Sequence, residues 1–140
     1  MNLKDLVIVS GMPGVFRLVA NRNNGLIVED MDSGKRRFAP ARVHQFTPLE
    51  SITIFTEDEE GITLSEVFES MLSKLEGTPP PEPNSDNASL RKYFTEVAPS
   101  HDPERVRISD IRKILRWFHF LHARDLLQPE PDTPAGEEEE

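Results

Sequence analysis

The sequence predicts an α+β protein in which a small β domain precedes a small helical one. Short β-rich runs separated by turn signals fill residues 6–56, and from residue 64 onward apolar residues recur at helical spacing. A proline-rich stretch at 78–86 then separates two amphipathic regions. The chain has 140 residues, which suits one ordinary domain or two very small ones.

The β domain is expected to span residues 1–57 and to contain five strands. These strands are expected at 6–9, 15–19, 26–28, 35–39 and 52–56, with Gly- or Asn-containing turns between the first four. A sheet this small does not hide its apolar faces as a flat ribbon, so we expect a five-stranded SH3-like barrel. The connection at 40–49 is expected to plug one end of it. An OB-fold is the alternative, although it usually needs more residues.

Residues 58–77 are expected to form an acidic turn and an amphipathic helix. Thr63 and Glu66 have the spacing of a capping box, in which each side chain bonds the other's backbone N–H at the start of a helix. The apolar stripe that follows consists of Leu64, Val67, Phe68, Met71, Leu72 and Leu75. This stripe must be buried against the barrel, the later helices or a second copy.

The linker at 78–86 contains four of the chain's prolines and is taken as the domain boundary. The helical module at 87–128 is expected to hold one helix that ends at Pro99 and a longer one that begins at Ser109 or Asp110. Residues 129–140 are expected to be a disordered acidic tail. Two modules this small are marginal alone, so we expect them to pack through the 64–75 helix or to dimerise.

Charge and composition exclude several classes of protein. The chain has no Cys, which excludes disulfides, thiolate metal sites and a cysteine nucleophile. The net charge of −9 is uneven, because 1–56 and 84–128 are each +2, 57–83 is −7 and 129–140 is −6. No secretory signal and no membrane-spanning run are evident, so a cytoplasmic protein without membrane contact is expected.

Several runs together resemble an uncharacterised bacterial family, catalogued as domains of unknown function. They are SGMPGVFRLV, NNGLIVEDMDSGKRRF, SITIFTEDE, LRKYFTEVAP and DPERVRISDIRKILRWFHFL, and the resemblance covers residues 3–127. It implies a small N-terminal β domain ahead of a small C-terminal helical domain, and a bacterial source. It implies no activity, cofactor or site residue.

No catalytic, cofactor-binding or metal-binding residue is predicted. His119 and His122 lie three apart on a helix but lack further ligands at metal-site spacing, so we expect His122 at a packed edge and His119 in water. The loop at 10–14 lacks the spacing of a phosphate-binding loop, and Pro13 removes an amide donor from it.

Two functions therefore remain as expectations. The first is a non-enzymatic adaptor that binds other proteins or itself, with Trp117 and Phe120 as candidate contacts because they lie off the main apolar stripe. The second is an RNA- or DNA-associated accessory factor with a basic face. Its candidate contacts are Lys35, Arg36, Arg37, Arg112 and Arg116. An apolar groove containing Trp117 or Phe120 favours the adaptor, and one continuous basic face favours the accessory factor.

Overall fold

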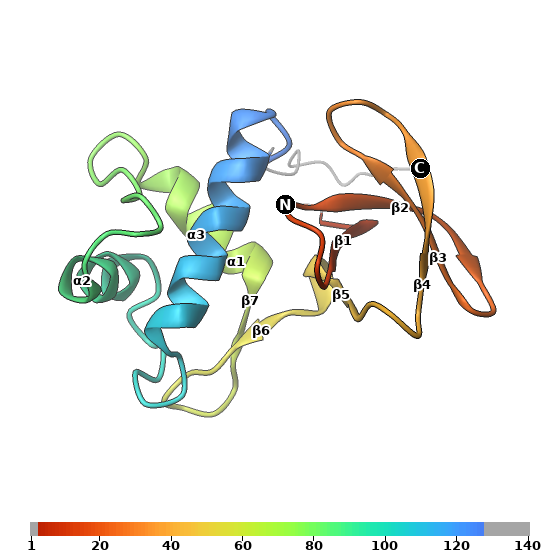
Figure 1. The fold of residues 1–140 in the computed structure, drawn as a ribbon. Helices are drawn as coiled ribbons and strands as arrows, with labels where there is room; N and C mark the ends of the chain where they lie inside the picture. Colours follow the sequence, from red (N-terminus) through yellow and green to blue (C-terminus); the bar gives the residue numbers. More distant parts are fainter. Residues whose placement is uncertain (1–2, 128–140) are drawn as a thin grey trace, which may run out of the picture.

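The structure is a computed structural model that describes residues 3–127, and it confirms the α+β class. A five-stranded antiparallel sheet lies on one side of the molecule and three helices lie on the other, with α3 between the sheet and α2 (Figure 1). No helix in residues 3–127 is long and apolar enough to cross a membrane. The acidic tail expected at 129–140 lies outside the described residues.

The sheet is an antiparallel meander whose last strand returns to the first. Its strands are β1 (Leu6–Val9), β2 (Phe16–Arg22), β3 (Gly25–Asp30), β4 (Arg36–Pro40) and β5 (Phe46–Pro48), in the order β4-β3-β2-β1-β5. The β2–β3 turn at Asn23 and Asn24 is the tight turn that the sequence predicts. Gly25 follows it because β4 lies so close that a Cβ there would be 2.2 Å from the Ala39 carbonyl oxygen.

The structure corrects the predicted fifth strand and does not confirm a closed barrel. The fifth strand of the sheet is β5 rather than 52–56, and β4 and β5 are opposite edges of the sheet. Part of the 52–56 run forms β6 (Thr53–Ile54), which pairs with β7 (Ile62–Thr63) in a separate two-stranded sheet. Closure is not needed to cover the apolar face of the main sheet, because Leu6 and Val15 pack into one core with the helices.

The 40–49 connection only partly fills the role predicted for it. Leu49, in the short 3₁₀ turn Leu49–Ser51, is fully buried in the core, whereas Val43 is 61% exposed. Phe46 lies in β5 and packs against a smaller cluster on the other face of the sheet. That cluster contains Val7, Val9, Phe16, Val28 and Ala39.

The three helices begin at local signals that the sequence carries. The capping box is confirmed before α1 (Leu64–Ser73), where the Glu66 amide donates to Thr63 Oγ1 at 3.2 Å and the Thr63 amide donates to Glu66 Oε2 at 2.8 Å. Asp86 caps α2 (Asn87–Val97). The longest helix, α3 (Ile108–Ala123), starts just before the predicted Ser109, because the Asp110 carboxylate accepts the Arg107 amide at 3.0 Å.

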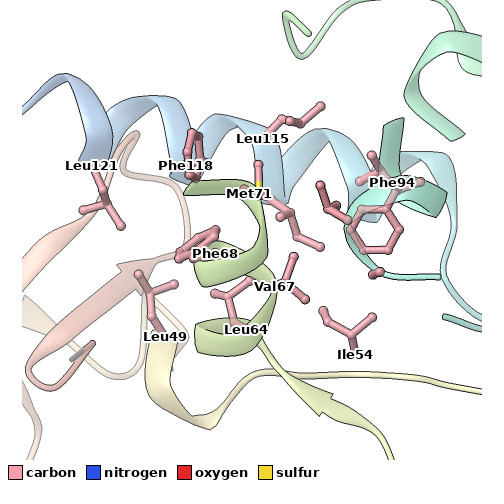
Figure 2. Close-up of a cluster of buried hydrophobic side chains, with 14 of the residues drawn as sticks. Leu49, Ile54, Leu64, Val67, Phe68, Met71, Phe94, Leu115, Phe118 and Leu121 are labelled. Atoms are coloured by element: carbon pink, nitrogen blue, oxygen red, sulfur yellow. The ribbon is translucent and has the colours of Figure 1, made fainter. Parts of the chain in front are cut away.

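One core joins the sheet to the helices, and α1 lies at its centre (Figure 2). The buried face of α1 presents Leu64, Val67, Phe68 and Met71. The Phe68 ring meets the Phe118 ring of α3 edge-on at 5.8 Å, and Leu49 from the sheet side packs into the same cluster. The two predicted modules therefore pack on each other through this helix.

A second contact ties the end of α3 to the sheet. The Arg124 guanidinium lies 3.7 Å from the centroid of the Phe120 ring, and its Nε and a terminal nitrogen donate to the two Asp32 carboxylate oxygens at 2.8 and 2.9 Å. Asp32 lies in the β3–β4 connection. Phe120 also lies against Gly14, which has a φ of +89° and where a Cβ would be 2.8 Å from the ring. We call Arg124, Asp32 and Phe120 the α3–sheet clamp.

The α3–sheet clamp makes stability depend on pH. The hydrogen bonds from Arg124 lower the pKa of Asp32 below its ordinary value of 3.8. Because the folded pKa is the lower one, the contribution is present above about pH 4 and is lost as the pH falls through the folded pKa. We expect Asp32→Asn to be less stable than the parent at pH 7, with a smaller gap at pH 3, as measured by urea unfolding. Arg124→Lys should behave similarly, and an equal gap at both pH values would contradict the assignment.

Tyr93 offers a test of the core near α2. Its side chain is buried, its hydroxyl has no hydrogen-bond partner within the described residues, and burial raises its pKa. An unpaired buried hydroxyl costs about 1–3 kcal/mol. We expect Tyr93→Phe to raise the free energy of unfolding by about 1 kcal/mol in urea unfolding. A clear loss of stability would show that the hydroxyl is hydrogen-bonded in solution.

Candidate functional site

An apolar groove lies between β6 and α3. It encloses about 170 Å³ and is lined by Ile52, Thr53, Ile54, Phe55, Val106, Asp110, Lys113, Ile114 and Trp117. Trp117 is half-buried, with part of its ring packed against the core, and Phe55 is 54% exposed. Trp117, one of the two predicted protein contacts, therefore lines this groove, and Phe55 lines it as well.

Charged groups of both signs surround this apolar groove. Lys113 is an exposed lining residue, and the Arg105 guanidinium lies 5.5 Å from the centroid of the Phe55 ring. Asp110 also lines the groove, but its carboxylate accepts the Arg107 amide at the start of α3. Arg105 is itself loosely paired with Asp102, at 3.6 Å.

A wider basic hollow lies on the sheet, and no residue of α3 lines it. It encloses about 780 Å³ and is lined by Gly11, Met12, Pro13, Phe16, Asp30, Ser33, Lys35, Arg36, Arg37 and His44. Lys35, Arg36 and Arg37 are three of the five predicted basic contacts, and all three are exposed. Arg36 pairs with Glu29 at 3.2 Å.

Local hydrogen bonds fix two further groups of the basic hollow. The Asp30 carboxylate accepts the amides of Ser33 and Asp32, and these bonds lower its pKa, so it stays negatively charged at neutral pH. His44 Nδ1 lies 2.6 Å from the Ser10 carbonyl oxygen. A carbonyl oxygen only accepts hydrogen bonds, so Nδ1 of His44 carries the proton in this contact.

The structure does not bring Arg112 and Arg116 together with the other three predicted basic residues. Arg112 is half-buried and binds the linker, donating to the carbonyl oxygens of Pro83 and Ser85 at 3.1 and 3.3 Å and to Asn87 Oδ1 at 3.1 Å. It is therefore a structural residue. Arg116 is exposed on α3, which contributes no residue to the basic hollow.

Phe120 and the two α3 histidines also have structural partners. Phe120 is covered by Arg124 and Gly14, so it belongs to the α3–sheet clamp rather than to a free surface. The expectation for the histidines is reversed, because His119 is half-buried with Nε2 3.0 Å from the Pro81 carbonyl oxygen, whereas His122 is exposed and stacks on Phe118. Within residues 3–127 no three His, Asp or Glu side chains are grouped as metal ligands.

Sequence reasoning missed Phe55 as a surface residue and His101 as a buried one. Phe55 lies in the predicted 52–56 strand, but its side chain is 54% exposed, and Ile54 takes the buried position of β6 instead. His101 Nδ1 is 2.7 Å from the Ala98 carbonyl oxygen and Nε2 is 3.1 Å from an Arg91 nitrogen. The alternation of Ile52 and Ile54 with Thr53 and Phe55 was the available signal for Phe55.

Comparison with known proteins places the chain in an uncharacterised family. A family model described as domain of unknown function (DUF6852) matches residues 52–121, and a second, domain of unknown function (DUF5606), matches residues 3–49. A solution NMR structure from Bacteroides vulgatus, determined as a structural genomics target, is 31% identical. It covers 99% of this chain and 98% of its own, with a TM-score of 0.73. No curated protein matches.

The chain therefore belongs to the family of proteins that carry this domain of unknown function, DUF6852. In this chain the DUF5606 match ends at Leu49 and the DUF6852 match begins at Ile52. Leu49 belongs to the shared core, and Ile52 packs against it. The resemblance to an uncharacterised family inferred from the sequence is confirmed.

The different roles of two neighbouring arginines are testable. We expect Arg112→Ala to lower the free energy of unfolding by about 1–3 kcal/mol, because it leaves linker carbonyl groups unpaired. Arg116→Ala is the matched control on the same helix and should change stability by less than about 0.5 kcal/mol. Urea unfolding measures both. Equal effects would contradict a structural role for Arg112.

Proposed function

We propose that this protein is a non-enzymatic adaptor that binds another protein at the apolar groove. The observation that carries the proposal is the position of Trp117 and Phe55 on opposite walls of one groove, with Phe55 54% exposed. Exposed aromatic side chains in concave sites supply a large share of the binding energy at protein interfaces.

The size and chemistry of the apolar groove suit the binding of a peptide side chain. At about 170 Å³ it is smaller than the roughly 300–1,000 Å³ usual for sites that enclose a small molecule. Its walls are mostly aliphatic and aromatic, and the Asp110 carboxylate is engaged by a backbone amide. A binding role fits this arrangement better than acid–base chemistry, which needs titratable groups facing the reacting atoms. The expected setting is the cytoplasm.

The second candidate function is nucleic-acid association at the basic hollow. It is favoured by the gathering of Lys35, Arg36 and Arg37 at one hollow and by Phe38 on the same strand, which is 41% exposed. Single-stranded nucleic acids bind such combinations of cationic and aromatic side chains. Arg112 donates its hydrogen bonds to linker carbonyl oxygens. This weighs against a continuous basic face that extends from the hollow to α3.

One capture experiment separates the two functions. Tagged full-length protein is recovered from its own cell lysate with and without nuclease, as the parent chain, as Phe55→Ala and as the Lys35/Arg36/Arg37→Ala variant. We expect partners that survive nuclease and fall about tenfold in Phe55→Ala. Phe55 is substantially exposed, so its replacement should preserve the fold, which circular dichroism checks.

Val43→Ala is the matched control, because Val43 is 61% exposed and does not line the apolar groove. It should recover the same partners as the parent chain. Partners that vanish with nuclease and depend on Lys35, Arg36 and Arg37 would replace the adaptor with the nucleic-acid function. Capture that is the same in Phe55→Ala and the parent would reject the apolar groove as the binding site.

A further inference from the structure

The wall of the apolar groove formed by β6 is the open edge of a strand. The Leu64 amide donates to the Ile52 carbonyl oxygen at 3.0 Å, and Thr53 and Ile54 pair with Thr63 and Ile62 of β7. In an antiparallel pair the backbone groups of alternate residues point to opposite sides. The amide and carbonyl of Thr53 therefore point away from β7, and within residues 3–127 no backbone group pairs with them there.

The chain itself pairs with the continuation of this edge. The Asp102 amide donates to the Phe55 carbonyl oxygen and the Glu57 amide donates to the Ser100 carbonyl oxygen, both at 2.9 Å, on either side of an antiparallel bridge between Thr56 and His101. After Asp102 the chain turns toward α3, since the Val106 amide donates to the Asp102 carbonyl oxygen at 2.8 Å. The strand that covers Phe55 and Glu57 thus leaves the edge just before Thr53.

We propose that the apolar groove binds an extended peptide segment of a partner protein, which adds to the Thr53 edge of β6 as an antiparallel strand and places an apolar side chain between Phe55 and Trp117. Thr53 lines the groove together with these two residues, so backbone pairing and side-chain insertion take place in one site. This combination is the usual form of recognition by strand addition. The proposal rests on the adaptor function and names its partner's chemistry.

The exposed cations near the apolar groove favour a peptide that carries acidic residues. Lys113 and Asp110 both line the groove, and Arg105 lies over the Phe55 ring but is paired with Asp102. The Asp110 carboxylate accepts the Arg107 amide at the start of α3, which leaves Lys113, and Arg116 nearby on α3, as exposed cations. The acidic residues at 57–60 do not line the groove. A peptide with Asp or Glu beside its apolar anchor would therefore meet complementary charge, which favours encounter and orientation.

The first test selects peptides without assuming a partner. A random peptide library displayed on phage is enriched on the full-length protein and depleted on Phe55→Ala. We expect enriched peptides that carry an aromatic or branched aliphatic residue next to Asp or Glu. Their affinity should fall in Lys113→Glu, and added salt should weaken them.

The second test asks whether the backbone of Thr53 takes part. Thr53→Pro removes the outward amide and no bond of the β6–β7 ladder, and Ile52, with φ −77° and ψ 128°, has the extended conformation that precedes proline. We expect the selected peptides to bind Thr53→Pro about tenfold more weakly than Thr53→Val, the control that keeps the amide. In the parent chain, hydrogen exchange of the Thr53 amide should slow by about tenfold or more when peptide binds.

The outcomes separate this proposal from the adaptor function. Peptides that need Phe55 but bind Thr53→Pro and Thr53→Val equally, without slowing exchange at Thr53, would overturn strand addition and leave the adaptor function standing. A selection that enriches no Phe55-dependent peptide would overturn both. If no peptide is enriched and sedimentation shows a dimer that depends on Phe55, the groove binds a second copy of this chain. That result would overturn the proposal of a bound partner peptide.

Discussion

The burial of the α1 stripe holds this protein together. Four apolar side chains on one face of a ten-residue helix contact the sheet side at Leu49 and α3 at Phe118 within one core. A helix this short is marginal alone, so its stability comes from packing on both sides. The capping box at Thr63 sets where the helix begins, and its start fixes the position of β7 and therefore of β6. The wall of the apolar groove is in this way a consequence of the core.

Local signals in the sequence predicted most of the elements but not how the sheet ends. The Asn23–Asn24 turn, the Thr63 capping box and the stripe of α1 depend on neighbours within a few residues, and the structure has all three. The sequence predicts 52–56 as the fifth strand because this run is rich in β-branched residues, whereas Phe46–Pro48, the actual fifth strand, is short and contains a proline. The pairing of β5 with β1 joins residues that are far apart in the sequence, and β-propensity does not predict such a contact.

Position on a helix predicts which side chains of α3 lie off its buried stripe, but not what covers them. Trp117 was recognised from its place off the α3 stripe, and it lines the apolar groove. Phe120 has a similar place on the helix, but the loop at Gly14 and the side chain of Arg124 cover it. Arg112 looked like a surface cation because the linker carbonyl groups that it binds lie 27 and 29 residues away. Such partners are set by the tertiary fold, which a single sequence does not reveal.

The core that runs across the junction near residue 50 makes the two family-matched regions a single cooperative unit. Residues from both, such as Leu6 on one side and Leu121 on the other, are buried in the same cluster. Separating the regions would expose the apolar face of each to water, so a fragment of either has little free energy to offset its chain entropy. Where the two domains occur in tandem as they do here, they are best regarded as halves of one folding unit, and a recombination event that exchanged one half would have to preserve the surface of the other.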